Sequence, residues 1–544
     1  MWDSRTDNLK MDKKRSILGN KIYLYLTEFF AGMTVMAVEL GASRLLAPYF
    51  SSSQIVWTII IGTIMIAMAL GNVWGGRSAD KNPNPDKLYG RILIAAIWIA
   101  AIPVFGKYII VAISGLLIIA VSNRFLIIAA FISCMVIFVF PLFLLGTVTP
   151  SLAKYAVGNL EESGKTIGTL GAFNTIGSII GTFVPTFISI PAVGTSVTFL
   201  IFAAILLALS LIYFICEKRK YVKAGVSLLL ILLCSIFGHS TSFAFWEEDL
   251  TYEGESIYNY LQVSDTPRST ILSTNVLFGV QSVTMKGESL TGLYYDYALA
   301  APYMAEKTEG LDILILGMGT GTYASQCSRY LKDAQVEGVE IDKKITDLAH
   351  KYFGLPEDVK VTTYDGRAYL QAVEEKYDVI MVDAYQDITI PFQMSTVEFF
   401  TLVREHLRED GVMVVNMNMH SSENLDADIN VYLADTISRV FPEVYVVDVP
   451  FCTNRELFAS VNPAMTDNLR ANTADEENGE LKELMEEILP GLAVYEAGGN
   501  ILTDDRAPVE LLGMQMIDSI IKDEIGHYKR IFREQGIAGL LNSM

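Results

Sequence analysis

Residues 311–342 of the chain read LDILILGMGTGTYASQCSRYLKDAQVEGVEID, and this stretch decides the fold of the C-terminal half. It predicts a buried strand, a glycine-rich turn, a helix, and a second strand that ends on an acidic residue. Gly317, Gly319 and Gly321 let the backbone turn tightly and bring its N–H groups close to a ligand. Glu340 ends the second strand where a ribose diol can be held. The pattern is typical of a nucleotide-binding βαβ unit.

The α/β pattern continues beyond this unit. Further strands are predicted at 359–363, 377–382 and 411–417, with helices at 343–353 and 397–407. Strands that alternate with helices form a mainly parallel sheet, and such a sheet binds its ligands at the carboxyl ends of its strands.

Three acidic residues, Glu340, Asp365 and Asp383, lie at or just after strand ends on this edge. We expect Glu340 to face ribose hydroxyls, Asp365 to face the exocyclic amine of an adenine, and Asp383 to face the reacting group in the same pocket. Each acid alone is equally compatible with a helix cap or a turn. Together, at ordered spacing, they indicate a ligand site.

The charge of the 544-residue chain is unevenly distributed. Residues 1–240 hold 19 Lys and Arg against 10 Asp and Glu, whereas residues 241–544 hold 22 against 51. An acidic second part disfavours nucleic acid as a partner and favours cationic ligands, although an acidic surface also serves solubility. The five cysteines show neither disulfide nor zinc spacing, so we expect no metal.

Apolar stretches dominate residues 1–240 and predict a polytopic α-helical membrane domain of seven or eight spans. The run 108–121 is short for a span, and we interpret it as an extra or an interfacial helix. The expected location is the cell membrane, multi-pass and in contact with lipid. The seven longer stretches begin near Ile22, Ile55, Ile92, Phe125, Ile167, Val197 and Val226.

The basic residues before the first stretch, in 77–91 and in 217–220 fit the cytoplasmic side if there are seven spans. That arrangement would place the acidic half outside the cell. A domain that uses an intracellular nucleoside belongs inside, which requires an eighth span or a re-entrant segment. We expect the cytoplasmic placement.

Polar residues inside the apolar half have two interpretations, which the sequence leaves open. Glu28 lies within the first stretch, and Glu39 and Arg44 lie at its end. They indicate either a binding site for a small cation or a structural ion pair near the interface. Gly177 and Gly181 have the spacing of closely packed helices.

Residues 241–300 alternate apolar and polar side chains over short runs, which predicts a small antiparallel sheet ahead of the nucleotide fold. The expected organisation is therefore a transmembrane domain at 1–240, a β-rich lid at 241–300, and a Rossmann-like catalytic domain with a C-terminal extension at 301–544.

Four motifs carry a resemblance to a known family. LGMGTGT (316–322), VEGVEID (336–342), YDGRAYL (364–370) and YDVIMVDAY (377–385) follow the motif order of the spermidine synthase, or polyamine aminopropyltransferase, family, a branch of the class I AdoMet-binding fold. The first half is similar to the membrane region of bacterial fused forms, in VELGASRLLAPYF (38–50) and ALGNVWGGRSAD (69–80). ILTDDRAPVELL (501–512) resembles their closing segment.

The resemblance implies a site for decarboxylated AdoMet and an adjoining site for an amine acceptor. Asp383 is implied as the group that accepts the proton of the attacking amine. The nucleoside site would be formed by Gln281, Gly317, Gly319, Gly321, Glu340, Asp365 and Gly366. The acceptor site would be formed by Tyr294, Asp296, Tyr385 and Asp387.

The chain departs from the family pattern at three places. Tyr295 replaces a histidine, and Asn259 stands where glutamine is usual. In the loop from Asp383 to Asp387 the second acid of the family pattern falls on Gln386, and Asp387 follows one residue later. This shift changes which carboxylates of the loop are expected to bind the amine acceptor.

The implied activity is transfer of an aminopropyl group to a polyamine acceptor such as putrescine, with release of methylthioadenosine and without a metal. A methyltransferase on the same fold is the first alternative, because fold does not fix function. A non-catalytic polyamine-sensing domain coupled to a transporter-like membrane region is the second. A homodimer is compatible with the sequence.

Overall fold

The structure is a computed structural model that describes residues 17–50, 52–120, 125–157, 163–218, 221–239, 242–243, 250–275, 280–287, 290–385, 390–418 and 428–516. The chain divides into two compact units. Residues 1–247 and 253–260 form the first, and residues 248–252 and 261–544 form the second.

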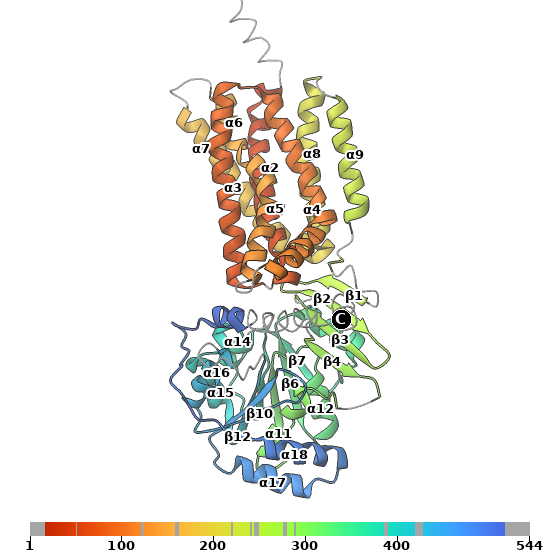
Figure 1. The fold of residues 1–544 in the computed structure, drawn as a ribbon, viewed down its shortest axis with the longest axis vertical. Helices are drawn as coiled ribbons and strands as arrows, with labels where there is room; N and C mark the ends of the chain where they lie inside the picture. Colours follow the sequence, from red (N-terminus) through yellow and green to blue (C-terminus); the bar gives the residue numbers. More distant parts are fainter. Residues whose placement is uncertain are drawn as a thin grey trace, which may run out of the picture. The chain divides into compact units, whose positions relative to one another are not determined.

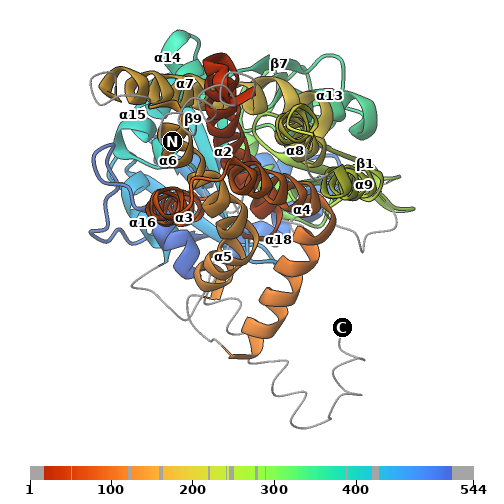
Figure 2. The same ribbon diagram turned by 90° about the horizontal axis from the view of Figure 1, so that it is seen from above.

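The first unit is a bundle of helices (Figures 1 and 2). Helix α2 packs along α7, α3 along α5, and α4 against α8 and α5. The described elements are η1 (Ile17–Gly19), α2 (Lys21–Phe50), α3 (Gln54–Lys81), α4 (Pro85–Ala120), α5 (Phe125–Gly146), α6 (Val148–Ala156), α7 (Ser163–Val184), η3 (Pro185–Ser189), α8 (Ile190–Cys216) and α9 (Tyr221–Gly238).

Glycines set the close approach of α2 and α7. A Cβ built on Gly177 would lie 2.0 Å from the carbonyl oxygen of Phe29, and one on Gly181 would lie 2.1 Å from that of Met33. Any larger residue would force the two helices apart. The close packing expected from the spacing of these glycines is confirmed.

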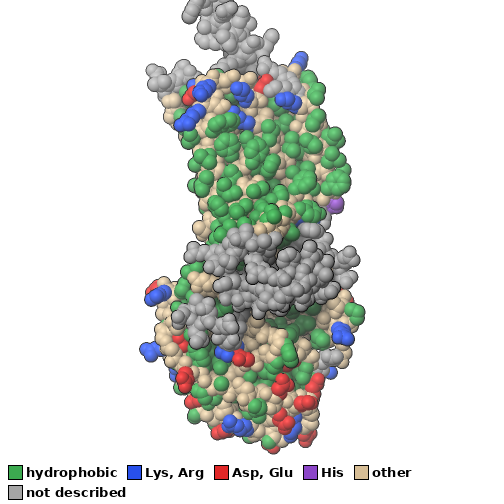
Figure 3. All heavy atoms as spheres, in the orientation of Figure 1, with side chains coloured by type: hydrophobic (Ala, Val, Ile, Leu, Met, Phe, Trp, Pro, Cys, Tyr) green, Lys and Arg blue, Asp and Glu red, His purple; other side chains and the backbone are tan. Residues whose placement is uncertain are grey.

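Six helical stretches in the described part of the chain are long and apolar enough to cross a membrane, judged by length and composition. The longest, Ser163–Cys216, contains α7, η3 and α8 and bends at Gly194, where φ is 81°. Hydrophobic side chains cover the face of this unit shown in Figure 3, and Lys and Arg side chains gather at one end. Such a surface is compatible with a lipid environment.

The expectation of a separate helix at 108–121 is wrong. Residues up to Ala120 continue α4, which runs without a break past the internal Pro103. Lys107 lies within this helix, and its ammonium donates a hydrogen bond to the carbonyl of Ser242 (2.9 Å). Val121 lies outside the described residues.

Glu28 and Arg44 of α2 both form hydrogen bonds with other segments. Oε1 of the buried Glu28 accepts from Thr149 Oγ1 (2.5 Å) and Asn174 Nδ2 (2.8 Å), which belong to α6 and α7. Arg44 donates to the carbonyl of Ile257. Among the described residues, the partners of Glu28 are thus neutral side chains.

The described residues from 250 onward form two sheets. The smaller has the strand order β1-β2-β3-β4, and β3 pairs antiparallel with β2 and with β4, as expected for the region 241–300. Its strands are β1 (Leu250–Glu255), β2 (Tyr260–Asp265), β3 (Ser269–Thr274) and β4 (Ser282–Met285).

The larger sheet has the order β12-β10-β11-β9-β8-β5-β6-β7. Strands β9, β8, β5, β6 and β7 pair in parallel, which confirms the α/β expectation. Strands β10, β11 and β12 add an antiparallel edge that the sequence did not predict. The strands are β5 (Asp312–Leu316), β6 (Gln335–Glu340), β7 (Lys360–Thr363), β8 (Tyr377–Val382), β9 (Leu407–Met417), β10 (Glu443–Asp448), β11 (Arg455–Ser460) and β12 (Ala493–Val494).

Two apolar cores lie on opposite faces of this sheet, because successive strand residues point to opposite sides. One includes Met381 and Val414, with side chains from α10, α11, α12, α17 and α18. The other includes Val382 and Val415, with side chains from α14, α15 and α16. The helical elements are α10 (Tyr294–Ala298), α11 (Ala300–Met304), α12 (Thr322–Tyr330), α13 (Lys343–Leu348), η4 (Ala349–Phe353), α14 (Gly366–Ala372), η5 (Phe392–Met394), α15 (Val397–His406), α16 (Ile429–Ser438), α17 (Met465–Asp475) and α18 (Gly479–Gly491).

Candidate active site

The glycine-rich turn after β5 requires glycine for two reasons. Gly317 has φ 85°, in the left-handed region, and a Cβ there would lie 2.4 Å from the α-carbon of Ala384. Gly321 has φ 84° and caps the N-terminus of α12. The turn therefore passes directly beside the residue that follows Asp383.

Glu340 lies at the end of β6 and is buried. Its Oε2 accepts a hydrogen bond from the N–H of Gly319 (2.9 Å), and its Oε1 accepts one from the N–H of Asp342 (2.9 Å). Burial raises the pKa of Glu340 to about 7, while the N–H donors act in the opposite direction. The carboxyl thus joins the glycine turn to the end of the second strand.

Asp365 is the N-cap of α14, where its Oδ1 accepts from the N–H of Ala368 (2.8 Å). The cap interpretation is confirmed, and a cap leaves carboxylate acceptor capacity for a ligand. Asp365 and Gly366 are half-buried after β7. Both lie at the same edge as Glu340, since Glu340 pairs with Thr363.

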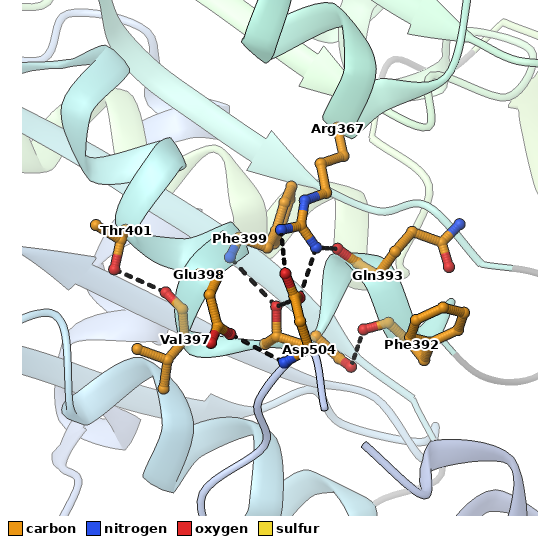
Figure 4. Close-up of polar contacts among 10 residues, drawn as sticks. Arg367, Phe392, Gln393, Val397, Glu398, Phe399, Thr401 and Asp504 are labelled. Carbon is orange, nitrogen blue, oxygen red and sulfur yellow. Dashed lines mark hydrogen bonds and ion pairs between the residues drawn. The ribbon is translucent and has the colours of Figure 1, made fainter. Parts of the chain in front are cut away.

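The segment near residue 504 is tied to this turn (Figure 4). Arg367 donates to both carboxylate oxygens of Asp504, each at 2.7 Å, and to the carbonyl of Gln393 (2.9 Å). Thr396 donates to the same carboxylate (2.7 Å). Two motifs 137 residues apart in sequence therefore form one structural unit next to Asp365.

Asp383 follows β8 and is held from two sides. Its Oδ2 accepts from the hydroxyl of Tyr294 (2.8 Å), and its Oδ1 accepts from the side-chain amide of Asn416 (2.9 Å). Burial raises the pKa of Asp383 to about 7, against the lowering effect of the two hydrogen bonds. A carboxyl poised near neutral pH can both bind an ammonium group and accept its proton.

Aromatic residues fix the surroundings of this acid. The rings of Tyr294 and Tyr295 are 3.9 Å apart, and Tyr295 donates to the carbonyl of Gln281 (3.0 Å). Tyr385 donates to the carbonyl of Asn416 (2.5 Å) and accepts from the N–H of Asn418 (2.9 Å). Tyr295, at the family's histidine position, therefore acts as a structural contact.

Asp296 has a different environment from the other expected site residues. It is buried, and its carboxylate accepts from the N–H groups of Thr291 and Gly292, the hydroxyl of Thr291, and the amide of Gln326. These contacts favour a structural role in the turn before α10. Asp387 and Gln386 lie outside the described residues.

Sequence reasoning missed Asn416, which orients Asp383. The available signal was an asparagine near the end of the apolar run GVMVVNM at the expected carboxyl edge. In the described residues, no group of His, Cys, Asp and Glu side chains could hold a metal ion.

Residues 293–468 match the family model described as "Spermine/spermidine synthase domain". A "Probable polyamine aminopropyl transferase" from Bifidobacterium longum is 53% identical over 354 residues, which cover 62% of this chain and 78% of that protein. A "Polyamine aminopropyltransferase" from Vibrio vulnificus is 26% identical over 304 residues, covering 53% and 98%. A probable spermidine synthase structure from Corynebacterium glutamicum is 20% identical with a TM-score of 0.35, covering 46% and 95%.

Proposed function

We infer the reaction from one premise: the chain belongs to the polyamine aminopropyltransferase family. It transfers the aminopropyl group of decarboxylated AdoMet to an amine acceptor and releases methylthioadenosine. The identity of the acceptor and the roles of individual residues are our proposals.

The nucleoside end of decarboxylated AdoMet would lie along the carboxyl ends of β5, β6 and β7. The backbone N–H groups at Gly317 and Gly319 would approach the ligand closely. Glu340 would hold the ribose hydroxyls, and Asp365 with Gly366 would contact the adenine. Gln281, whose carbonyl is held by Tyr295, would close the site from the smaller sheet. These assignments are supported by the shared edge on which the groups lie.

Asp383 is the residue that we propose to accept the proton. The observation that supports this role best is its pair of hydrogen bonds from Tyr294 and Asn416, which fix the carboxylate beside the glycine turn. Because a carboxylate with fixed orientation needs no rearrangement when it binds an ammonium group, it can position the amine for attack. Tyr385 would line the same acceptor site. Asp387 remains a candidate for binding the acceptor, on the basis of the sequence.

The chemical step consists of one bond made and one bond broken. The acceptor nitrogen forms a bond to the propyl carbon attached to the sulfonium, the carbon–sulfur bond breaks, and its electron pair stays on sulfur. The positive charge of sulfur is thereby neutralised, and a proton passes from nitrogen to Asp383. The carboxylate also offsets the repulsion between two cationic substrates.

We further propose that residues 1–240 form a membrane domain, that 241–300 form a lid, and that 301–544 form the catalytic domain on the cytoplasmic side. The apolar helical stretches support the first assignment by length and composition. The polyamine acceptor agrees with the acidic balance of the second half.

The test is mass analysis of products after incubation of the full chain, in detergent, with 1,4-diaminobutane and either decarboxylated or intact AdoMet. We expect an aminopropylated amine and methylthioadenosine with the decarboxylated form alone. Methylated product from intact AdoMet would favour the methyltransferase alternative, and binding without turnover would favour a sensing domain.

A further inference from the structure

Three polar residues form a row across three neighbouring strands. Val382 of β8 lies opposite Val415 of β9, so the next residues, Asp383 and Asn416, also lie opposite each other. Asn416 in turn lies opposite Glu456 of β11. With strands roughly 4.7–4.9 Å apart, the α-carbons of Asp383 and Glu456 are about 9.5 Å apart.

The three side chains lie on the same face of the sheet. Met381, Val414 and Phe458, each two positions away in its strand, all belong to the apolar core on the side of α10 and α12. Since side chains alternate with a period of two, Asp383, Asn416 and Glu456 share that face. The hydrogen bond from Asn416 to Asp383 agrees with this orientation.

Glu456 is completely buried, and neither carboxylate oxygen has a hydrogen-bond partner among the described residues. A buried carboxyl without hydrogen bonds costs several kcal/mol, so structural needs alone do not explain it. Its neighbour Arg455 is engaged with Asp448 (2.5 Å) and points away, because adjacent strand residues face opposite sides.

Among the described residues, the groups that interact electrostatically with Glu456 carry no positive charge. They are the carboxyl of Asp383, the hydroxyls of Tyr385 and Tyr323, and the thiol of Cys452. Burial and the charge of Asp383 hold the pKa of Glu456 well above its usual range. Asp383 and Glu456 therefore lie on the same face of the sheet without a cation among the described groups that interact with them, and ammonium groups would stabilise both carboxylates in their ionised form.

We propose that Glu456 binds a second ammonium group of the acceptor, while the attacking nitrogen lies at Asp383. The acceptor is then an amine with at least two cationic nitrogens, extended along the row over Asn416. This inference rests on the proposed function, because it takes Asp383 as the site of the attacking nitrogen. Glu456 is a specificity-determining residue that selects diamines over monoamines.

The test compares 1,4-diaminobutane with 1-aminobutane, in which a methyl group replaces the second ammonium. In the unaltered protein we expect kcat/KM for the diamine to exceed that for the monoamine by about 10–100-fold, as a charge-assisted contact predicts. Glu456→Gln keeps the shape and should raise KM for the diamine by about 10–100-fold with kcat little changed. It should also remove most of the preference for the diamine.

Glu443→Gln is the matched control, because Glu443 lies at the other end of the β10/β11 pair, opposite Ser460. It removes the same formal charge and should leave both substrates unaffected. If the Glu456 variant does not fold, the comparison of the two amines in the unaltered protein still tests the proposal. Equal kcat/KM values for the diamine and the monoamine would overturn it.

Equilibrium binding separates this proposal from the proposed function. Calorimetry with the full chain, saturated with methylthioadenosine, measures diamine binding without turnover. We expect Glu456→Gln to weaken binding about 10–100-fold and to lower the number of protons released on binding, because the cation ionises Glu456 in the unaltered protein. Unchanged affinity and proton release would overturn the role of Glu456, whereas tight binding without any aminopropyl product would overturn the reaction instead.

Discussion

The parallel and antiparallel parts of the large sheet carry different acidic residues. The parallel strands β9, β8, β5, β6 and β7 present the glycine turn, Glu340, Asp365 and Asp383 at one edge. The antiparallel strand β11 contributes Glu456. In our proposal, the parallel part binds the nucleoside and positions the reacting atoms, while the antiparallel part recognises the acceptor.

Two buried glutamates of the large sheet, Glu340 and Glu456, differ in their partners. Glu340 accepts one hydrogen bond on each oxygen from the backbone of the chain itself, which fixes its orientation and leaves acceptor capacity for a ligand. Glu456 has no such partners among the described residues. A buried acid that the chain itself hydrogen-bonds is stable without a ligand, whereas burial of an unpartnered acid is costly and a ligand would offset that cost.

The largest expected effect follows substitution of Asp383. Asp383→Asn keeps the size of the side chain but removes the proton acceptor, so turnover should fall by about 10²–10⁴. Binding of methylthioadenosine should stay nearly intact, because that ligand occupies the other part of the site. Steady-state kinetics and calorimetry measure the two quantities.

Asp410→Asn serves as the control for this substitution. Asp410 lies in β9, six residues before Asn416, and is half-buried. It should retain full turnover. If Asp383→Asn retained turnover, the proton acceptor would have to be sought elsewhere, and Asp387 would be the first candidate.

The next effect concerns the nucleoside. Glu340→Gln should weaken methylthioadenosine binding by about 1.5–3 kcal/mol, the contribution expected of charge-assisted hydrogen bonds to ribose hydroxyls. The exposed Glu357→Gln is the control. An unchanged dissociation constant for the Glu340 variant would mean that this carboxyl only holds the glycine turn.

The sequence predicts the parallel part of the sheet well and the antiparallel part poorly. Alternation of strands and helices is a local pattern, and the motifs around Glu340, Asp365 and Asp383 indicate their strand ends directly. The partners of Asp383 come from Tyr294 and Asn416, which are 89 and 33 residues away, and no local pattern encodes such contacts. Long-range pairing is fixed only by the tertiary structure.

Two further sequence expectations depend on the same long-range contacts. The role of Asp296 in the acceptor site stays a prediction, and the hydrogen bonds of its carboxylate lie within its own turn and to Gln326. The run 108–121 was separated from its helix because Lys107 looks like a boundary, yet α4 continues through it. Side-chain direction and the length of a helix depend on neighbours that a sequence window does not contain.

The pH dependence gives an effect of intermediate size. The pKa of Asp383 is raised to about 7, so the free protein loses the ionised carboxylate as the pH falls below this value. The amine acceptor stays protonated throughout this range, with a pKa near 10 as for lysine. We therefore expect kcat/KM for the acceptor to fall about tenfold from pH 8 to pH 6.

Tyr294→Phe sharpens this pH test. The hydroxyl of Tyr294 donates to Asp383 and lowers its pKa, so its removal should move the acidic limb of the profile to higher pH. A profile that is flat between pH 6 and pH 8 in the unaltered protein would contradict the assignment of Asp383.

The smallest expected effect tests how the closing segment supports the nucleoside side of the comparison. Arg367 forms a two-pronged contact with Asp504 and is largely shielded, with 17% of its side chain exposed. Arg367→Lys keeps the charge but loses the planar fork, so the turn that carries Asp365 becomes less rigid. We expect methylthioadenosine binding to weaken by about 2–5-fold, which corresponds to about 0.5–1 kcal/mol.

Arg470→Lys, in an exposed pair with Asp467, is the matched control and should leave the affinity unchanged. Equal affinities for the two variants in calorimetry would mean that the contact with Asp504 stabilises the fold without positioning Asp365, and the adenine contact would then depend on α14 alone.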